Sequence, residues 1–285
     1  MIYFTTKAFN AETTLGRAVE SVLAQTYGDF RYYICDNGSQ DGTGELIREY
    51  AGQDKRIVPV FQYPNCRRFY DDGTWCRDFE RYIARPMFYL EPSDWLASLD
   101  SDDEYAPDFL EETLRFAGQE RLDYVACCSD HIREPEGISD NRVVLEADIV
   151  IEREGFDTLF PNYFRYMGAY WGKLRRGSLF HRIDRAAFEQ WHRNNMLFYR
   201  EDTAMELYFL RYSERAGVRA ALLHRYHIYP EGTSSRQSKD KLAQDNLKMP
   251  GIYRAFLLAK SGYVSEKNER YIQEVFERSQ RMIGG

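Results

Sequence analysis

The sequence has no apolar run that approaches the roughly 20 residues needed to cross a lipid bilayer. Its first residues, Met1-Ile2-Tyr3-Phe4, carry neither the basic flank nor the small-residue cleavage site of a secretory signal. We therefore expect a soluble, cytoplasmic protein, and leave open a peripheral contact with the inner face of the membrane.

The sequence also has no excess of basic residues, since its 38 Lys and Arg are outnumbered by 45 Asp and Glu. The formal net charge of the 285 residues is -7 and the isoelectric point is near 5.4. Proteins bind nucleic acid through basic surfaces, so nucleic acid is not expected as the main ligand. The five cysteines are odd in number and lack the paired spacing of a metal site, which indicates reduced thiols.

Carboxylates, by contrast, gather after an apolar run. Trp95-Leu96-Ala97-Ser98-Leu99 is typical of a buried strand, and Asp100, Asp102 and Asp103 follow it directly. Because like charges this close repel, the cluster is easiest to explain if Mg²⁺ or Mn²⁺ binds there through oxygen ligands. The alternative is a solvated acidic turn in front of a helix that starts near Pro107, with Asp103 or Glu104 beside the positive end of that helix.

Hydrophobic periodicity predicts alternating strands and helices. Strands are expected at 2–6, 30–35, 57–62, 124–128 and 143–151, and helices at 12–25, after 43, after 107 and after 200, followed by two polar helices between about 240 and 283. Ser265 is the expected N-cap of the last helix.

Parallel sheets bind ligands beyond the carboxyl ends of their strands. The first two strands are therefore expected to bring Phe9 and Asn10 together with Asp36 and Asn37 at one edge of the sheet. An ordinary strand-to-helix turn would explain the glycines and Ser39 in this region, but it gives Asp36 no particular role.

The segment 224–236 combines strand alternation and a turn with hydroxyl, Arg and His side chains. Arg can bind phosphate oxygens through two donors at once, and Ser and His can add single hydrogen bonds, so the segment suits a diphosphate. The same residues would also fit an exposed basic hairpin.

Several motifs in chain order resemble family 2 glycosyltransferases. The resemblance is carried first by the segments 21–27, 36–39 and 41–43, which read SVLAQTY, DNGS and DGT. The acidic turn at 100–103 resembles the family's Asp-x-Asp site, and it is followed by Pro107-Asp108-Phe109-Leu110-Glu111. Trp171-Gly172-Lys173-Leu174 and Glu201-Asp202 resemble two later motifs, so the resemblance spans roughly residues 2 to 236.

This resemblance implies a GT-A type α/β fold, with one mixed, mostly parallel sheet flanked by helices in a domain of residues 1–236. Residues 237–285 would form a helical C-terminal extension. The implied activity is inverting, metal-dependent transfer of a sugar from a nucleotide diphosphate donor, expected to be UDP-linked, to an acceptor hydroxyl. The acceptor would be a saccharide, a lipid-linked saccharide or a protein, in cell-surface polysaccharide or glycoconjugate synthesis.

The resemblance also implies roles for individual residues. Asp102 would hold Mn²⁺ or Mg²⁺, Asp202 would be the catalytic base, and Trp171 would lie at the acceptor and donor-sugar region. On spacing alone, Glu201-Asp202 reads as an acidic first helical turn, which is common. The donor nucleotide would be bound by Phe9, Asn10, Asp36, Asn37 and Asp100, and its diphosphate by Arg225, His227, Ser234 and Arg236.

Three departures from the family pattern leave a second function open. Asn37 replaces an acidic residue, Lys7 stands where Thr or Pro is usual, and the loop around Asn65 is longer and lacks glycines. These changes would suit a non-catalytic nucleotide-sugar binding module, although the retained Asp202 argues against it. A nucleotidyltransferase would need a glycine-rich N-terminal loop, which the segment 5–9 lacks.

Overall fold

The computed structural model describes residues 1–62, 89–152, 155–159, 172–194, 200–230 and 239–283. The described strands form one sheet in the order β3-β2-β1-β4-β9-β6-β10-β5, with β7 paired to β6 and β8 paired to β10. The strands are β1 (Ile2–Ala8), β2 (Phe30–Asp36), β3 (Ile57–Phe61), β4 (Trp95–Ser98), β5 (Glu104–Tyr105), β6 (Tyr124–Arg133), β7 (Ile138–Val143), β8 (Ile149–Ile151), β9 (Lys173–Arg176) and β10 (Ala216–Ile228). The helices are α1 (Leu15–Leu23), α2 (Thr43–Gln53), α5 (Phe109–Glu120), α6 (Gly155–Leu159), α8 (Gly177–His181), α9 (Arg185–Asn194), α10 (Glu201–Tyr212), α11 (Lys239–Ser261) and α12 (Glu266–Ile283).

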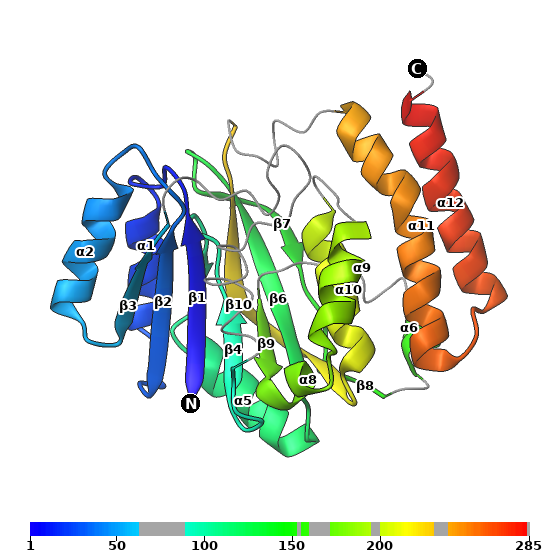
Figure 1. Ribbon diagram of the computed structural model, residues 1–285, viewed down its shortest axis with the longest axis horizontal. Helices are drawn as coiled ribbons and strands as arrows, with labels where there is room; N and C mark the ends of the chain where they lie inside the picture. Colours follow the sequence, from blue (N-terminus) through cyan, green and yellow to red (C-terminus); the bar gives the residue numbers. More distant parts are fainter. Residues whose placement is uncertain (63–88, 153–154, 160–171, 195–199, 231–238, 284–285) are drawn as a thin grey trace.

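The N-terminal part of the sheet is purely parallel. β3, β2, β1 and β4 pair side by side in one direction, with Ile2 opposite both Phe30 and Trp95. Phe4 and Tyr32 lie in the core and contact each other edge to face, next to the buried Leu15 of α1 and Ile47 of α2. The strand-helix-strand prediction for this part is confirmed, and Figure 1 shows these elements at the left.

The rest of the sheet is mixed. β9 runs antiparallel to both β4 and β6, whereas β6 and β10 are parallel to each other, so six of the ten strands share one direction. β6 extends to Arg133, beyond the predicted 124–128, because its second half pairs with both β7 and β10. The predicted mixed, mostly parallel sheet flanked by helices is confirmed.

One predicted strand, 143–151, is wrong. The structure divides this region between β7, which pairs with β6, and β8, which pairs with β10. The break has a physical cause at Asp148, whose carboxylate accepts a 2.7 Å hydrogen bond from the backbone N–H of Ala220 and pairs with Arg219. Asp148 therefore binds the point where the register of β10 shifts against β6.

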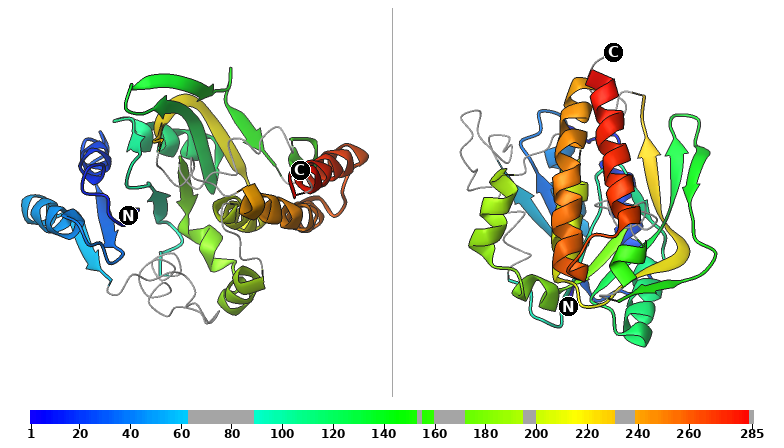
Figure 2. Two further views of the ribbon diagram at one scale, coloured as in Figure 1. Left: turned by 90° about the horizontal axis from the view of Figure 1, so that it is seen from above. Right: turned by 90° about the vertical axis from the view of Figure 1, so that its right-hand side faces the viewer.

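The C-terminal helices α11 and α12 form an antiparallel pair at the right of Figure 1 and in Figure 2. Their buried residues Met249, Tyr253, Leu257 and Ile272 belong to the same hydrophobic cluster as residues of β6 and α10. Ser265 caps α12, as predicted, because its Oγ accepts a 3.4 Å hydrogen bond from the backbone N–H of Asn268. Within the described residues, no helix has the length and apolar character of a membrane span.

The topology brings two distant segments to one edge of the sheet. The loop after β4 leaves its carboxyl end, which is also the carboxyl end of β1, β2 and β10. α10 ends at Tyr212, just before β10 begins at Ala216, so α10 runs back along the sheet and its first residues lie toward the same carboxyl edge. Asp202, in the first turn of α10, therefore lies toward the same end of the sheet as residues 100–103.

Candidate active site

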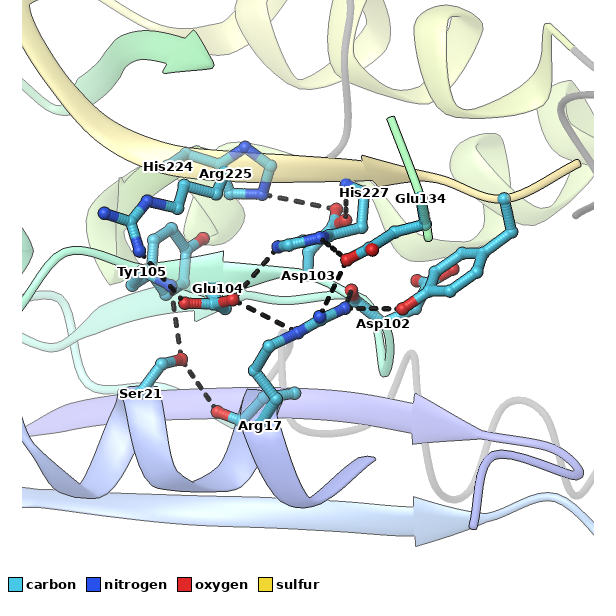
Figure 3. Close-up of polar contacts among 12 residues, drawn as sticks. Arg17, Ser21, Asp102, Asp103, Glu104, Tyr105, Glu134, His224, Arg225 and His227 are labelled. Carbon is cyan, nitrogen blue, oxygen red and sulfur yellow. Dashed lines mark hydrogen bonds and ion pairs between the residues drawn. The ribbon is translucent and has the colours of Figure 1, made fainter. Parts of the chain in front are cut away.

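The three aspartates of the acidic loop, residues 100–103, lie in different surroundings. Asp103 is fully buried, and its Oδ1 accepts a 2.9 Å hydrogen bond from the backbone N–H of His227. Its Oδ2 lies 3.3 Å from Nε2 of His224, as Figure 3 shows. Asp100 and Asp102 remain partly exposed at the loop. The acidic loop is therefore not a solvated turn, and Asp103 attaches it to β10 instead of capping α5.

The electrostatic state of the acidic loop favours a cation. Removal from water raises the pKa of the Asp100 carboxyl well above its usual range, and the charges of Asp103, Asp202 and Asp102 raise it further. The pKa of Asp102 is also raised, mainly by burial, although Arg17 and two histidines act in the opposite direction. Carboxylates that repel one another in a partly buried loop are stabilised when a positive charge binds between them.

The influence of Asp202 on Asp100 brings α10 into the same site. Asp202 is exposed, in the first turn of α10, and its charge is one of those that raise the pKa of Asp100. The start of α10 is fixed from outside by α11, since the backbone N–H of Arg200 donates a 3.1 Å hydrogen bond to the carboxylate of Asp245. The start of α10 therefore lies close enough to the acidic loop for the charges of Asp202 and Asp100, 102 positions apart in the sequence, to interact.

The ends of β1 and β2 form the second part of this edge. Asp36 is fully buried, and its Oδ1 accepts a 2.9 Å hydrogen bond from the backbone N–H of Ser39. Asn10 has a positive φ of 49° and its Oδ1 accepts a hydrogen bond from the backbone N–H of Gln40. Phe9 is 48% exposed beside these two turns. The structure therefore gives Asp36 a role in closing the turn and leaves an aromatic ring uncovered next to it.

A residue that the sequence analysis missed lies beside Asp36. Gln62 is 3% exposed, and its backbone N–H donates to the carbonyl of Asp36. Among the residues that the structure describes, the buried side-chain Nε2 of Gln62 has no hydrogen-bond partner. A buried amide with an unused donor is costly, and such groups often mark a ligand site. The polar residue that ends the apolar run of β3 was the available sequence signal.

An ion network lies behind the acidic loop (Figure 3). Nε of Arg17 lies 3.1 Å from Glu104 Oε1, and its Nη1 donates a 3.1 Å hydrogen bond to Glu134 Oε1. His227 stands between the same two carboxylates, with Nδ1 2.8 Å from Glu134 Oε1 and Nε2 3.0 Å from Glu104 Oε1. His227 beside Glu104 lowers the pKa of that carboxyl. We call Arg17, Glu104, Glu134 and His227 the ion quartet.

The predicted diphosphate residues are placed only in part. His227 is 6% exposed and both of its ring nitrogens contact carboxylates of the ion quartet. Arg225 is exposed, and its Nη1 lies 3.4 Å from Glu104 Oε2, at the end of the quartet away from Asp102 in Figure 3. Ser234, Arg236 and Trp171 lie outside the described residues.

A second buried polar cluster supports α10 from below, and the sequence analysis also missed it. Glu206 is fully buried one turn after Asp202, and its Oε2 accepts a 2.5 Å hydrogen bond from Tyr124 and one of 3.1 Å from Nε of Arg175. Lys173 is fully buried as well, and burial lowers its pKa to about 8. Because residues i and i+4 share a helix face, fixing Glu206 against the sheet also fixes the direction of Asp202. The signal was a lone acid among apolar residues of α10.

The acidic loop fits a divalent cation through its donor chemistry. Asp100 and Asp102 offer hard oxygen ligands. In the part of the chain that the structure describes, no group of three or more His, Cys, Asp or Glu side chains is arranged to hold a metal by itself. Mg²⁺-type sites often use one or two carboxylates and take their remaining ligands from substrate phosphates and water, which suits two carboxylates at an open edge.

The mixed, mostly parallel sheet flanked by helices is a GT-A type of fold. The model of the family described as glycosyl transferase family 2 matches residues 5–63 and 92–179. The chain belongs to glycosyl transferase family 2.

Three known proteins are similar to this chain in sequence or in fold. The glucosyltransferase WfaP of Escherichia coli is 27% identical over 115 residues, 40% of each chain. TarS of S. aureus in complex with UDP-GlcNAc has a TM-score of 0.66 at 12% identity, covering 99% of this chain and 72% of TarS. The mannosyltransferase PcManGT of Pyrobaculum calidifontis, in complex with GDP-Man and Mn²⁺, has a TM-score of 0.55 at 12% identity, covering 99% and 74%. The matches cover 37%, 45% and 41% of the lengths of three of the curated relatives.

Proposed function

We propose that this protein transfers a sugar from a UDP-linked donor to an acceptor hydroxyl, with inversion at the anomeric carbon and with the help of a divalent cation. The observation that carries the proposal is that the acidic loop after β4, with Asp100 and Asp102, and the start of α10, with Asp202, lie at the same carboxyl edge of the sheet, close enough for the charge of Asp202 to act on Asp100. Two carboxylates that suit a cation and a third, exposed one on a separate helix are what metal-assisted transfer requires.

The donor nucleotide would lie over the ends of β1 and β2. Phe9 offers an uncovered ring for stacking, while Asn10, Asp36, Asn37 and Asp100 offer polar groups for the base and ribose. UDP is proposed as the nucleotide because the similar TarS structure holds UDP-GlcNAc. Arg225, Ser234 and Arg236 remain proposed diphosphate ligands. We assign His227 to the ion quartet, because both of its ring nitrogens already contact carboxylates.

Mn²⁺ or Mg²⁺ would be held by Asp102 together with diphosphate oxygens, and when bound it would neutralise charge on the departing diphosphate. Asp202 would take the proton from the acceptor hydroxyl while that oxygen attacks the anomeric carbon opposite the diphosphate. The new bond is the glycosidic C–O bond, the broken bond joins the sugar to the diphosphate, and the proton moves to the Asp202 carboxylate. Trp171 is proposed to bind the sugar region.

The acceptor is proposed to be a saccharide, lipid-linked or free, in the synthesis of a cell-surface polysaccharide. This rests on WfaP, whose name describes transfer of glucose to a lipid-diphosphate-linked GlcNAc. An acceptor anchored in lipid would place the reaction at the inner face of the membrane. Proteins are the remaining class of acceptor.

The experiment is a binding and turnover screen. Thermal unfolding is followed with a panel of UDP-, GDP- and dTDP-sugars, each with Mn²⁺ and with chelator, and donor hydrolysis and product stereochemistry are then measured for the sugar that stabilises most. Stabilisation by UDP-sugars that needs Mn²⁺, with slow hydrolysis, supports the proposal. Mn²⁺-dependent binding without hydrolysis or transfer to any saccharide acceptor would favour the non-catalytic binding module.

A further inference from the structure

Helix α1 and the turn after it hold the chain that follows the acidic loop. Ser21 lies on α1, and Gln25 lies two residues beyond its last residue, Leu23. Ser21 Oγ accepts a 3.2 Å hydrogen bond from the backbone N–H of Tyr105, and Gln25 Nε2 donates a 2.7 Å hydrogen bond to the carbonyl of Ala106. The amide oxygen of Gln25 accepts a hydrogen bond of 3.0 Å from the N–H of Leu110. These side chains thus replace missing backbone partners between β5 and the first turn of α5.

Arg17 lies on the same face of α1 as Ser21, four positions before it, and it reaches the acidic loop itself. Its Nη2 donates a 2.8 Å hydrogen bond to the backbone carbonyl of Asp102 and a 2.6 Å one to the hydroxyl of Tyr229 (Figure 3). Its other nitrogens contact Glu104 and Glu134 of the ion quartet. A planar guanidinium can serve all these acceptors at once, whereas an ammonium is a single point of charge.

We propose that Arg17 is a positioning residue for Asp102, which it directs toward the cation by holding the carbonyl of the same residue. This inference rests on the proposed function, because it presumes that Asp102 binds the metal. Arg17 touches neither substrate nor cation in this assignment. Partners that orient a metal ligand commonly contribute a factor of about 10 to 100 in metal affinity.

The direction of the change in Mn²⁺ affinity distinguishes a positioning role of Arg17 from a purely electrostatic one. A cation beside a metal ligand repels the metal, so if Arg17 acted through its charge alone, Arg17→Met would strengthen Mn²⁺ binding and Arg17→Lys would leave it unchanged. Positioning predicts the opposite pattern, in which both variants weaken Mn²⁺ binding. The lysine retains the charge but cannot reproduce the fork of hydrogen bonds.

The experiment is a calorimetric titration of Mn²⁺ into the full chain saturated with UDP. For Arg17→Lys we expect the Mn²⁺ dissociation constant to rise about tenfold. The matched control is Arg115→Lys, an exposed arginine of α5 that pairs with Glu112 one turn away. Its titration should follow the parent protein. Thermal unfolding without metal and nucleotide is measured for each variant.

The outcomes are distinct. A lower unfolding midpoint for Arg17→Lys with a parent-like Mn²⁺ titration would show a purely structural role and overturn the inference, as would stronger Mn²⁺ binding by Arg17→Met. If Arg17→Lys does not fold, Tyr229→Phe removes one guanidinium acceptor, and a parent-like Mn²⁺ titration of this variant overturns the inference equally. If the parent protein itself binds no UDP with Mn²⁺, the proposed function fails first.

Discussion

Asp103 is bound to the backbone of His227 by a 2.9 Å hydrogen bond, although it stands next to the residue proposed to hold the metal. This contact shows that the aspartates of the acidic loop have different roles. Asp103 is buried and ties the loop to β10, and its neighbours Asp100 and Asp102 stay at the edge, where Asp202 approaches from α10. One cluster of acids therefore combines a structural residue, Asp103, with the residues that we propose to bind the cation and the donor.

The division predicts different phenotypes for adjacent residues. Asp102→Asn should weaken UDP binding in Mn²⁺ at least about tenfold. It should leave the unfolding midpoint of the metal-free protein unchanged or higher, because it removes a charge that raises the pKa of Asp100 and Asp103. Calorimetry with UDP in Mn²⁺ and in chelator measures the first effect. Equal UDP affinities of the parent protein under both conditions would contradict the metal site.

Asp103→Ala should instead lower stability. The substitution leaves the buried backbone N–H of His227 without its acceptor, and a buried donor that loses its partner costs about 1–3 kcal/mol. Chemical unfolding of the metal-free variant measures this loss. A parent-like free energy of unfolding together with lost Mn²⁺ binding would show that Asp103, not Asp102, is the metal ligand.

The part of the site that we propose to bind the nucleobase gives another prediction. Within the described part of the chain the buried Nε2 of Gln62 has no hydrogen-bond partner, and we propose that it donates to a carbonyl of the nucleobase next to Asp36. A neutral hydrogen bond contributes about 0.5–1.5 kcal/mol, so Gln62→Leu should weaken UDP binding roughly 2- to 13-fold while pyrophosphate binding stays the same. The exposed Gln53→Leu is the control. If Gln62→Leu binds UDP like the parent, the amide takes no part in the site.

Asn37 is expected to influence which nucleobase this part of the site accepts. It can donate as well as accept hydrogen bonds where a carboxylate only accepts, so we expect dTDP and GDP to compete with UDP. Competition titrations against bound UDP measure this selectivity. A preference for UDP of more than about a hundredfold, some 2.7 kcal/mol, over each of the other nucleotides would contradict the expectation.

The fold was accessible from the sequence because its N-terminal half obeys local rules. Leu15, Val19 and Val22 recur at helical spacing, and all three are buried in α1. The acidic loop and Asp202 were accessible as motifs in a recognisable order. The strand 143–151 was misplaced because one residue, Asp148, turns toward β10, a partner about 70 positions away that no local pattern indicates.

The missed residues share the same cause. Arg17 binds Glu134, 117 positions away, and Arg175 binds Glu206, 31 positions away. From the local sequence alone, charged residues of this kind are predicted to lie on a solvated helix or strand face, because their partners are distant in the sequence. For Arg17, the available signal was its spacing of four from Ser21 within the SVLAQTY motif, because residues so spaced share one helix face.

Lys173 gives a prediction on pH. Burial lowers its pKa from 10.5 to about 8, so between these values the unfolded chain binds more protons, and stability rises with pH. The free energy of unfolding of the parent minus that of Lys173→Met should therefore grow by roughly 1 kcal/mol between about pH 7.5 and about pH 9. Subtracting the variant removes the titration of tyrosines and thiols. A difference that is flat or falls with pH would mean that Lys173 stays charged.

The last prediction concerns Asp202, the proposed base. Asp202→Asn keeps the shape of the side chain and removes its basicity. Since a general base typically contributes about 10² to 10⁴ in rate, transfer should fall by that order. UDP and Mn²⁺ binding should change little, because these rest on Asp102 and on the ends of β1 and β2. Initial rates with the identified acceptor and UDP calorimetry measure the two effects separately.

The matched control for Asp202 is Asp29→Asn, an exposed aspartate just before β2 at the opposite, amino edge of the sheet. It removes the same charge from the protein without touching the site, so its transfer rate should equal that of the parent. Transfer by Asp202→Asn within a few-fold of this control would exclude Asp202 as the base. Parallel loss of donor binding and transfer would instead mean that Asp202 maintains the start of α10, because a base acts on the acceptor and leaves donor affinity intact.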